Sequence, residues 1–240
     1  MRKLLGLSSR SLLIIASVCH GQAEAIEIAE VFRDGECTPY VQANFVGSAA
    51  NLDSSGFNTL GIFSNSGDDT DSNVGFGGAL GLKKEYDSFR VRPEFEVMWR
   101  QDSEHVTNSF PGPPEPIIFF YDAKSSDNWS TLANLWLDVP VSEKLWLYGG
   151  GGLGAAGTHL TVDDTEVHGE KTASNFAWQA GGGFILPVGD RCELDLGYRF
   201  LDMGSTSVPL SVSLDGRTSG SYVADMASHN LMFSVRLYVP

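Results

Sequence analysis

The chain lacks any apolar segment long enough to cross a membrane as a helix, which takes about 18 residues. The apolar run near its start, residues 12–18, is much shorter. Basic residues are also scarce, with 16 Lys and Arg against 30 Asp and Glu and a formal net charge of −14. Because phosphates would be repelled by such a chain, we expect it not to bind nucleic acid.

The motifs of common hydrolases and redox enzymes are missing too. There is no HExxH, Gly-x-Ser-x-Gly or Cys-x-x-Cys motif. Ser228–His229 and the separate His105, His159 and His168 are available, but they stand in no recognisable arrangement of nucleophile, base and orienting group. We therefore predict that the protein is not an enzyme and has no catalytic residues and no cofactor.

Acidic residues gather in two polar stretches, Asp68, Asp69 and Asp71, and Asp163, Asp164, Glu166 and Glu170. We interpret both as solvated loops, with a divalent-cation site as the alternative. His159 and His168 flank the second stretch, so a metal bound there is a further alternative. Our prediction is that no residue binds a metal.

The first 25 residues resemble an export signal. Arg2, Lys3 and Arg10 make a positive leader, residues 12–18 follow as the apolar run, and residues 23–25 read Ala-Glu-Ala. Lipid attachment at Cys19 is an alternative, disfavoured by the large Val18 before it. We predict a cleaved signal peptide at residues 1–25, a periplasmic tail at residues 26–37 and one outer-membrane domain at residues 38–240.

Two-faced strands dominate the rest of the chain. In residues 89–100 the odd positions are bulky and mostly apolar, and the even positions are mostly charged. Strand side chains alternate between two faces, so this segment has one apolar and one charged face. Eight such segments occur, near residues 40–49, 74–84, 89–100, 129–138, 145–160, 175–186, 192–203 and 229–239. Most approach the roughly 9–11 residues that a tilted strand needs to cross a bilayer.

The connections between these segments alternate in length. Short turns fall at residues 85–88, 139–144 and 187–191, and long loops at residues 51–73, 101–128, 161–174 and 204–228. Outer-membrane barrels have short periplasmic turns and long extracellular loops. The pattern predicts an all-β fold, an eight-stranded antiparallel transmembrane β-barrel. Inside the last loop, residues 210–217 favour a hairpin turn, and Pro93 suggests a bulge.

A soluble barrel with its apolar face inward is the alternative. An eight-stranded interior holds only packed side chains or one small ligand, and the Trp, Phe, Tyr and Leu of these strands would crowd it. Turned outward, they would meet lipid, and Gly, Ser, Asn and paired charges would fit the lumen. Leu132 and Trp136 fall on the polar side and weaken this pattern.

Four segments resemble the small outer-membrane β-barrel proteins of the opacity-protein and outer membrane protein A-like group. They are residues 134–138 (Asn-Leu-Trp-Leu-Asp), 147–154 (Leu-Tyr-Gly-Gly-Gly-Gly-Leu-Gly), 176–184 (Phe-Ala-Trp-Gln-Ala-Gly-Gly-Gly-Phe) and 194–200 (Leu-Asp-Leu-Gly-Tyr-Arg-Phe). The resemblance implies a porin-family barrel of the outer membrane. Its members serve as adhesins, structural proteins or surface antigens. The chain departs from the group by ending in Pro240 rather than Phe.

Charged residues on the inward faces should form a network, because unpaired ions in a narrow lumen carry large desolvation costs. The predicted members are Lys83, Arg90, Arg92, Glu94, Glu96, Asp138, Glu193, Asp195, Arg199 and Arg236. A gated ion path is the alternative use of these residues. An open channel is not expected, since water-filled lumens belong to barrels of about 16 strands or more.

Cys37 and Cys192 remain after the predicted cleavage, and both belong to the periplasmic rim. That compartment is oxidising, so we predict a disulfide between them. A strand lies between the two, so the segment before the first strand would have to fold across the rim.

We therefore expect an outer-membrane surface protein with a structural or adhesive role and specificity in its extracellular loops. The alternative is a lipid-modifying hydrolase or a small-solute pore. Expected partners are outer-membrane lipid and lipopolysaccharide, the barrel-assembly machinery, and a host or cell-surface ligand of the loops.

Overall fold

The computed structural model describes residues 37–58, 63–111, 119–164 and 166–239. The predicted signal peptide and residues 26–36 of the predicted tail lie outside this part of the chain. Residues 38–240 form one compact unit. Among the described residues, no helix is long and apolar enough to cross a membrane.

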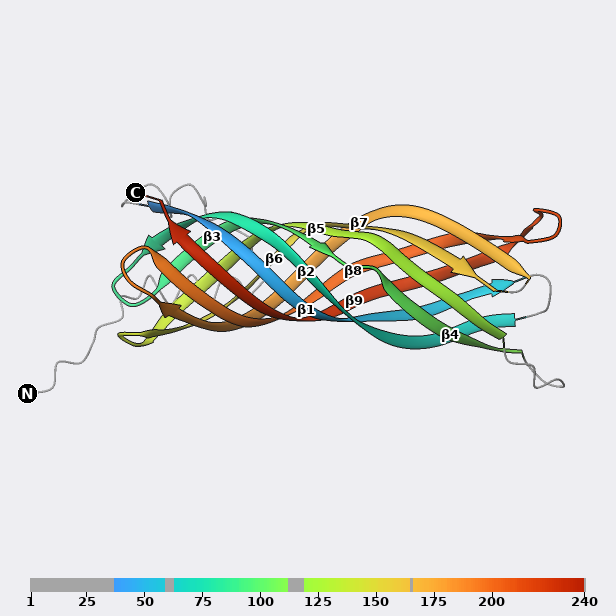
Figure 1. The fold of residues 1–240 in the computed structure, drawn as a ribbon, viewed down its shortest axis with the longest axis horizontal. Coiled ribbons are helices and arrows are strands. Elements are labelled where there is room, and N and C mark those ends of the chain that lie inside the picture. Colours follow the sequence, from blue (N-terminus) through green and yellow to red (C-terminus); the bar gives the residue numbers. More distant parts are fainter. Residues whose placement is uncertain (1–36, 59–62, 112–118, 165, 240) are drawn as a thin grey trace, which may run out of the picture. The chain divides into compact units, whose positions relative to one another are not determined.

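Within these residues, nine strands form one antiparallel sheet (Figure 1). They are β1 (Cys37–Asn58), β2 (Phe63–Glu85), β3 (Arg90–Arg100), β4 (Ser103–Pro111), β5 (Phe119–Ser142), β6 (Leu145–Asp163), β7 (Val167–Pro187), β8 (Cys192–Val212) and β9 (Thr218–Tyr238).

The sheet closes on itself. β1 pairs with β9 from Tyr40 opposite Tyr238 to Asn58 opposite Gly220, and β1 also pairs with β2. β3 and β4 follow one another between β2 and β5, interrupted at Gln101 and Asp102. They share one place in the ring, so the barrel has eight strand positions, as predicted.

Side chains alternate across the wall as the sequence indicated. On β3, Arg92 and Glu96 are buried inside the barrel, whereas Phe95 and Trp99 are 54% and 50% exposed on the outside. The large exposed residues of β8 and β9, such as Leu196 and Phe233, follow the same rule. The apolar face is therefore the outer face at this level of the barrel. The alternative of a soluble barrel with its apolar face inward is wrong here.

Trp136, which seemed misplaced in the pattern, lies inside the barrel with no exposed surface. Its indole Nε1 donates to Glu94 Oε1 at 3.2 Å, and the Arg199 guanidinium carbon lies 4.6 Å from the centre of its ring. An indole with a hydrogen-bond acceptor and a cation over its face is satisfied in a charged lumen.

The strands are longer than predicted. β5 has 24 residues and begins at Phe119, and β7 has 21 and begins at Val167, so most of the expected long loops are strand. The physical reason is that continued pairing satisfies the backbone of these segments outside the membrane. The predicted hairpin turn is present between β8 and β9, where Gly216 has a φ of 70°.

The predicted bulge at Pro93 is wrong. Gly81 pairs with Glu94 and Lys84 with Val91 in one unchanged register, and Pro93 itself stays opposite Leu135 on β5. Proline lacks only its own N–H, so β3 accommodates it without an extra residue.

The barrel has two parts of opposite polarity. Along β1 the outward positions run through Val41, Phe45 and Gly47 and then change to Asp53 and Ser55, which marks the end of the apolar band. Above that level the interior contains a large apolar cluster beside buried polar side chains such as Thr107. The cluster consists of Leu52, Tyr121, Ala123, Leu160, Val162, Val167, Val208, Leu210, Tyr222, Ala224 and Met226. We call the part with the long hairpins the extramembrane half.

Candidate functional site

The lumen at the level of the apolar band is filled with paired charges. Arg92 Nε donates to Asp138 Oδ2 at 2.7 Å across β3 and β5, and neither side chain has more than 1% of its surface exposed. Glu94 Oε2 accepts a hydrogen bond from Tyr40 Oη at 2.9 Å and lies 3.9 Å from Arg92 Nη1. Glu94 thus links β1, β3 and β5 through the middle of the barrel.

A second group of charges joins β8 and β9. Arg236 Nη1 donates to Glu193 Oε2 at 2.7 Å, and Arg236 Nη2 donates to Asp195 Oδ2 at 3.2 Å. Tyr238 and Tyr148 donate to Glu193 and Asp195 at 2.7 and 2.8 Å. Each carboxylate therefore accepts from both a cation and a phenol, which offsets its desolvation.

Towards the extramembrane half, Arg199 is hydrogen-bonded to Glu96. Asn44 and Gln179 also donate to Glu96, at 3.1 and 3.2 Å. At the other end, Arg90 bridges Glu85 and Glu193 at 3.0 and 2.9 Å.

All ten residues that the sequence placed in the lumen lie on the inner face. Lys83 is bonded to Glu85 at 2.9 Å, and its ammonium lies 4.0 Å from the centre of the Tyr238 ring. The sequence did not indicate Glu85, which follows the end of the alternating run, or the three tyrosines. The tyrosines Tyr40, Tyr148 and Tyr238 occupy inward positions, which is the signal that would have found them.

A second barrier lies above the charges. The apolar core of the extramembrane half brings Leu52, Leu160 and Tyr222 together with no exposed surface on any of the three. Tyr121 and Tyr222 pack with ring centres 5.9 Å apart, and the hydroxyls of Tyr222 and Thr107 are 3.1 Å apart. Side chains thus fill the described interior at two successive levels.

Side chains of β2 bond to the backbone of β4 and join these two strands of the barrel wall. Asp69 Oδ2 accepts from the backbone N–H of Val106 at 2.8 Å, and Asp71 Oδ2 accepts from that of Glu104 at 3.0 Å. Main-chain pairing of these two strands extends only from Phe63 opposite Pro111 to Asn65 opposite Ser109. We call the stretch held by the two carboxylates the acidic seam.

His105 lies beside this seam, 3% exposed, and its Nδ1 has no hydrogen-bond partner. Burial lowers the pKa of His105 below its ordinary value, while the nearby carboxylates of Asp69 and Asp71 act in the opposite direction. Asp69 and Asp71, which we expected in a solvated loop, therefore lie in β2 and bond this strand to β4. Among the described residues, no group of three or more His, Cys, Asp or Glu side chains is arranged to hold a metal ion.

The other histidines of the described residues, His159, His168 and His229, lie on the outside. Ser228 is buried inside the barrel, whereas His229 is exposed and hydrogen-bonded to Tyr198, so the two adjacent residues face opposite sides of the wall. His159 Nδ1 lies 2.9 Å from Thr172 Oγ1. Strand alternation thus separates the serine and histidine that the sequence offered as neighbours.

Cys37 and Cys192 are both half-buried free thiols in the structure. Cys192 lies opposite Leu237 on β9, the strand between β1 and β8. The disulfide between them stays a prediction, and non-reducing peptide mapping of alkylated membranes tests it. Two alkylated thiols would rule it out.

A closed antiparallel barrel with an apolar exterior and paired charges inside is a transmembrane β-barrel, because closure leaves no backbone group unpaired in hydrocarbon. The family model of the outer membrane protein beta-barrel domain matches residues 21–236. The chain therefore belongs to this family of outer-membrane proteins.

Several solved barrels are similar. The outer membrane protease OmpT from Escherichia coli has a TM-score of 0.51 at 5% identity, covering 84% of this chain and 97% of OmpT. Neisserial surface protein A has a TM-score of 0.42 at 17% identity, covering 85% and 100%. Ail, the attachment invasion locus protein of Yersinia pestis, has 0.39 at 16% identity, covering 85% and 100%. No curated protein sequence shows a significant match. At such identities the similarity concerns the fold alone.

Proposed function

We propose that the protein is a surface protein of the outer membrane with a structural or adhesive role. The observation that supports this most is the extramembrane half, where the strands continue well past the apolar band around a core of their own. A strand wall packed on an apolar core is a stiff platform, suited to presenting a constant surface to a partner. The partner would be a host or cell-surface ligand.

The filled interior argues against the alternative of a small-solute pore. A solute would have to pass the Arg92–Asp138 and Arg236–Glu193 pairs and then the core around Leu160 and Tyr222. Moving one partner of a buried ion pair away from the other costs about 3–5 kcal/mol. The layer of ion pairs and the apolar core beyond it therefore favour a closed interior over a solute path.

The other alternative, a lipid-modifying hydrolase, needs a serine and a base together on the outer surface. Ser228 faces the interior and His229 faces the outside, which supports a non-enzymatic role. Outer-membrane lipid, lipopolysaccharide and the barrel-assembly machinery are the further partners that we propose for a barrel of this kind.

The test is a comparison of cells displaying the full barrel with cells displaying a trimmed one. Ser205 pairs with Asp225 across β8 and β9, so a short turn can replace residues 206–224 and leave the membrane part intact. We expect binding to host cells, or to other cells, to fall at least tenfold in the trimmed variant. Single-channel recording and a serine-hydrolase probe are run alongside. Conductance or labelling, with equal binding by both forms, would replace our proposal with one of the alternatives.

A further inference from the structure

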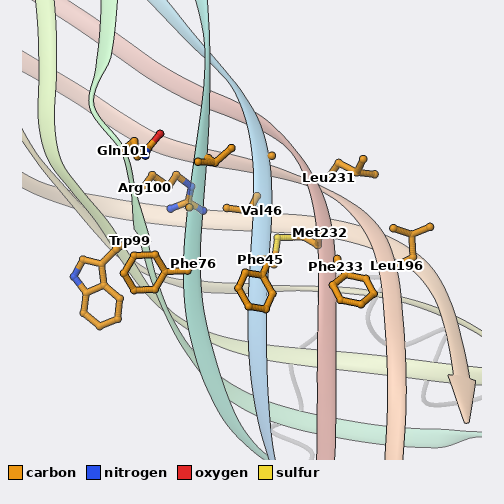
Figure 2. Close-up of a pocket in the computed structure, with 13 residues that line it drawn as sticks. Phe45, Val46, Phe76, Trp99, Arg100, Gln101, Leu196, Leu231, Met232 and Phe233 are labelled. Atoms are coloured by element: carbon orange, nitrogen blue, oxygen red, sulfur yellow. The ribbon is translucent and has the colours of Figure 1, made fainter. Parts of the chain in front are cut away.

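A groove of about 720 Å³ crosses the outer face of the barrel near the upper edge of the apolar band (Figure 2). It lies over β1, β2, β3, β8 and β9, and almost all of its lining is apolar. The volume falls within the range of pockets that hold small ligands, about 300–1,000 Å³.

One wall of the groove is a continuous row of large side chains. Trp99 lies opposite Phe76, Phe45 opposite Phe233, and Phe233 opposite Leu196. Since β1 pairs with β2, the row is unbroken across the five strands, and Figure 2 shows the four rings side by side.

The groove exists because the next row of outward positions, which includes Val74 and Leu231, has no side chain at Gly47. Gln101 bonds to Val74 through its backbone N–H, and Gly47 lies opposite Leu231. Gly47 faces outward, and a Cβ placed on it would meet no atom within 4 Å. A single missing side chain therefore leaves a hollow between bulky neighbours.

The end of the groove is polar. Gln101, which follows β3 and lines the groove, is exposed, and outside the groove, one outward row further along β9, His229 bonds to Tyr198. An apolar hollow with a polar rim fits an amphiphile whose chain lies in the hollow and whose head group lies at the rim. Aromatic girdles mark the level where hydrocarbon meets head groups. The Trp99 row has this position, on the side of the long hairpins, which is the extracellular side.

We propose that the groove at Gly47 is a binding site for one acyl chain of an outer-leaflet membrane lipid. The groove is continuous with the surface that the barrel already turns to the bilayer, so the chain reaches it without leaving hydrocarbon. A recessed chain contacts protein on its floor and both sides, whereas a chain on a convex barrel wall contacts it on one side. Such a lipid stays with the barrel longer than its neighbours do.

The test fills the hollow. Gly47→Leu adds a side chain into open space, so the barrel should fold, and heat-modifiable mobility verifies that it does. Gly149→Leu is the matched control, because Gly149 also faces lipid, on β6, and its Cβ would make one ordinary contact at 3.8 Å. The full barrel in detergent micelles is incubated with dimyristoylphosphatidylglycerol, and native mass spectrometry counts the lipids that remain bound.

We expect the wild type and Gly149→Leu to retain one lipid per barrel, and Gly47→Leu to retain at least fivefold less. A probe lipid spin-labelled on its chain should broaden the amide resonances of Val74 and Leu231 in the wild type and in Gly149→Leu, and much less in Gly47→Leu. Equal retention by the three proteins, or no retention by the wild type, would overturn the proposal. A wild-type dimer that Gly47→Leu dissociates would also overturn it, since the groove would then be a contact between two copies.

Discussion

Arg92 and Asp138 form an ion pair of 2.7 Å from Nε to Oδ2 inside a barrel whose wall is exposed to lipid, and both side chains are at most 1% exposed. The pair joins β3 to β5, and Arg92 also lies 3.9 Å from Glu94. Buried pairs of this kind stabilise little against an apolar replacement but cost much when one member is lost.

We therefore expect Arg92→Gln to lower the free energy of unfolding by about 3–5 kcal/mol, because it leaves the Asp138 charge uncompensated. Arg92→Gln with Asp138→Asn should be less destabilising than the single change. Urea unfolding in micelles, followed by heat-modifiable mobility, measures both. The exposed pair Lys124–Asp102, at 3.4 Å with both side chains 50% exposed, is the control. Its coupling should stay below about 1 kcal/mol. Absence of coupling between Arg92 and Asp138 would contradict a paired network.

Two phenylalanines of almost equal exposure test where the bilayer lies. Phe95, in the apolar band, is 54% exposed, and Phe120, on the extramembrane half, is 56% exposed. Phe95→Arg places an ion in hydrocarbon and should cost about 2–4 kcal/mol, whereas Phe120→Arg should change the stability little because its side chain meets water. Refolding yield into lipid vesicles reports the difference. Equal losses in the two variants would show that the band is misplaced.

The apolar core of the extramembrane half can be weakened without touching the membrane part. Leu160 is fully buried and Leu153 on the same strand is 60% exposed to lipid. Leu160→Ala should cost about 2–5 kcal/mol through the cavity it leaves, and Leu153→Ala much less. Hydrogen exchange should rise at Leu52 and Tyr222 and stay unchanged at Arg92. A rise spread evenly over the whole barrel would mean that the two halves do not unfold separately.

We expect His105 to make the stability of the extramembrane half depend on pH. Because its pKa in the folded barrel is below the ordinary value of 6.5, the unfolded segment binds the proton more readily. The stability of this region should be full above pH 6.5 and should decline as the pH falls below it. Limited proteolysis between pH 5 and pH 7.5, about the range in which histidine titrates, would follow the loss. His105→Asn should flatten the profile, and His168→Asn, at an exposed position, should not. A profile unchanged by His105→Asn would assign the pH dependence elsewhere.

Much of the barrel was predictable from the two-residue period, as in residues 89–100, where bulky odd positions alternate with mostly charged even positions. The extended strands were missed because the same period continues with reversed polarity. Val162 and Val208 face inward there, while Asp163 and Ser207 face outward. Because their outward faces are polar, these segments do not match the pattern of membrane-spanning strands and resemble loops in the sequence. The partners of each charge could not be predicted either, because Arg92 had several carboxylates within reach and only the stagger of β3 against β5 selects Asp138.

The separate core of the extramembrane half also determines which residues of this half tolerate mutation. Leu52, Val162 and Ala224 hold that half together, and between them Asp53, Asp163 and Asp225 contact neither core nor lipid. Outward positions such as these three can therefore change with little cost in folding. A surface of this kind can change in sequence while the strands beneath it keep their register, so two variants can share one scaffold and differ in the outward side chains of this half.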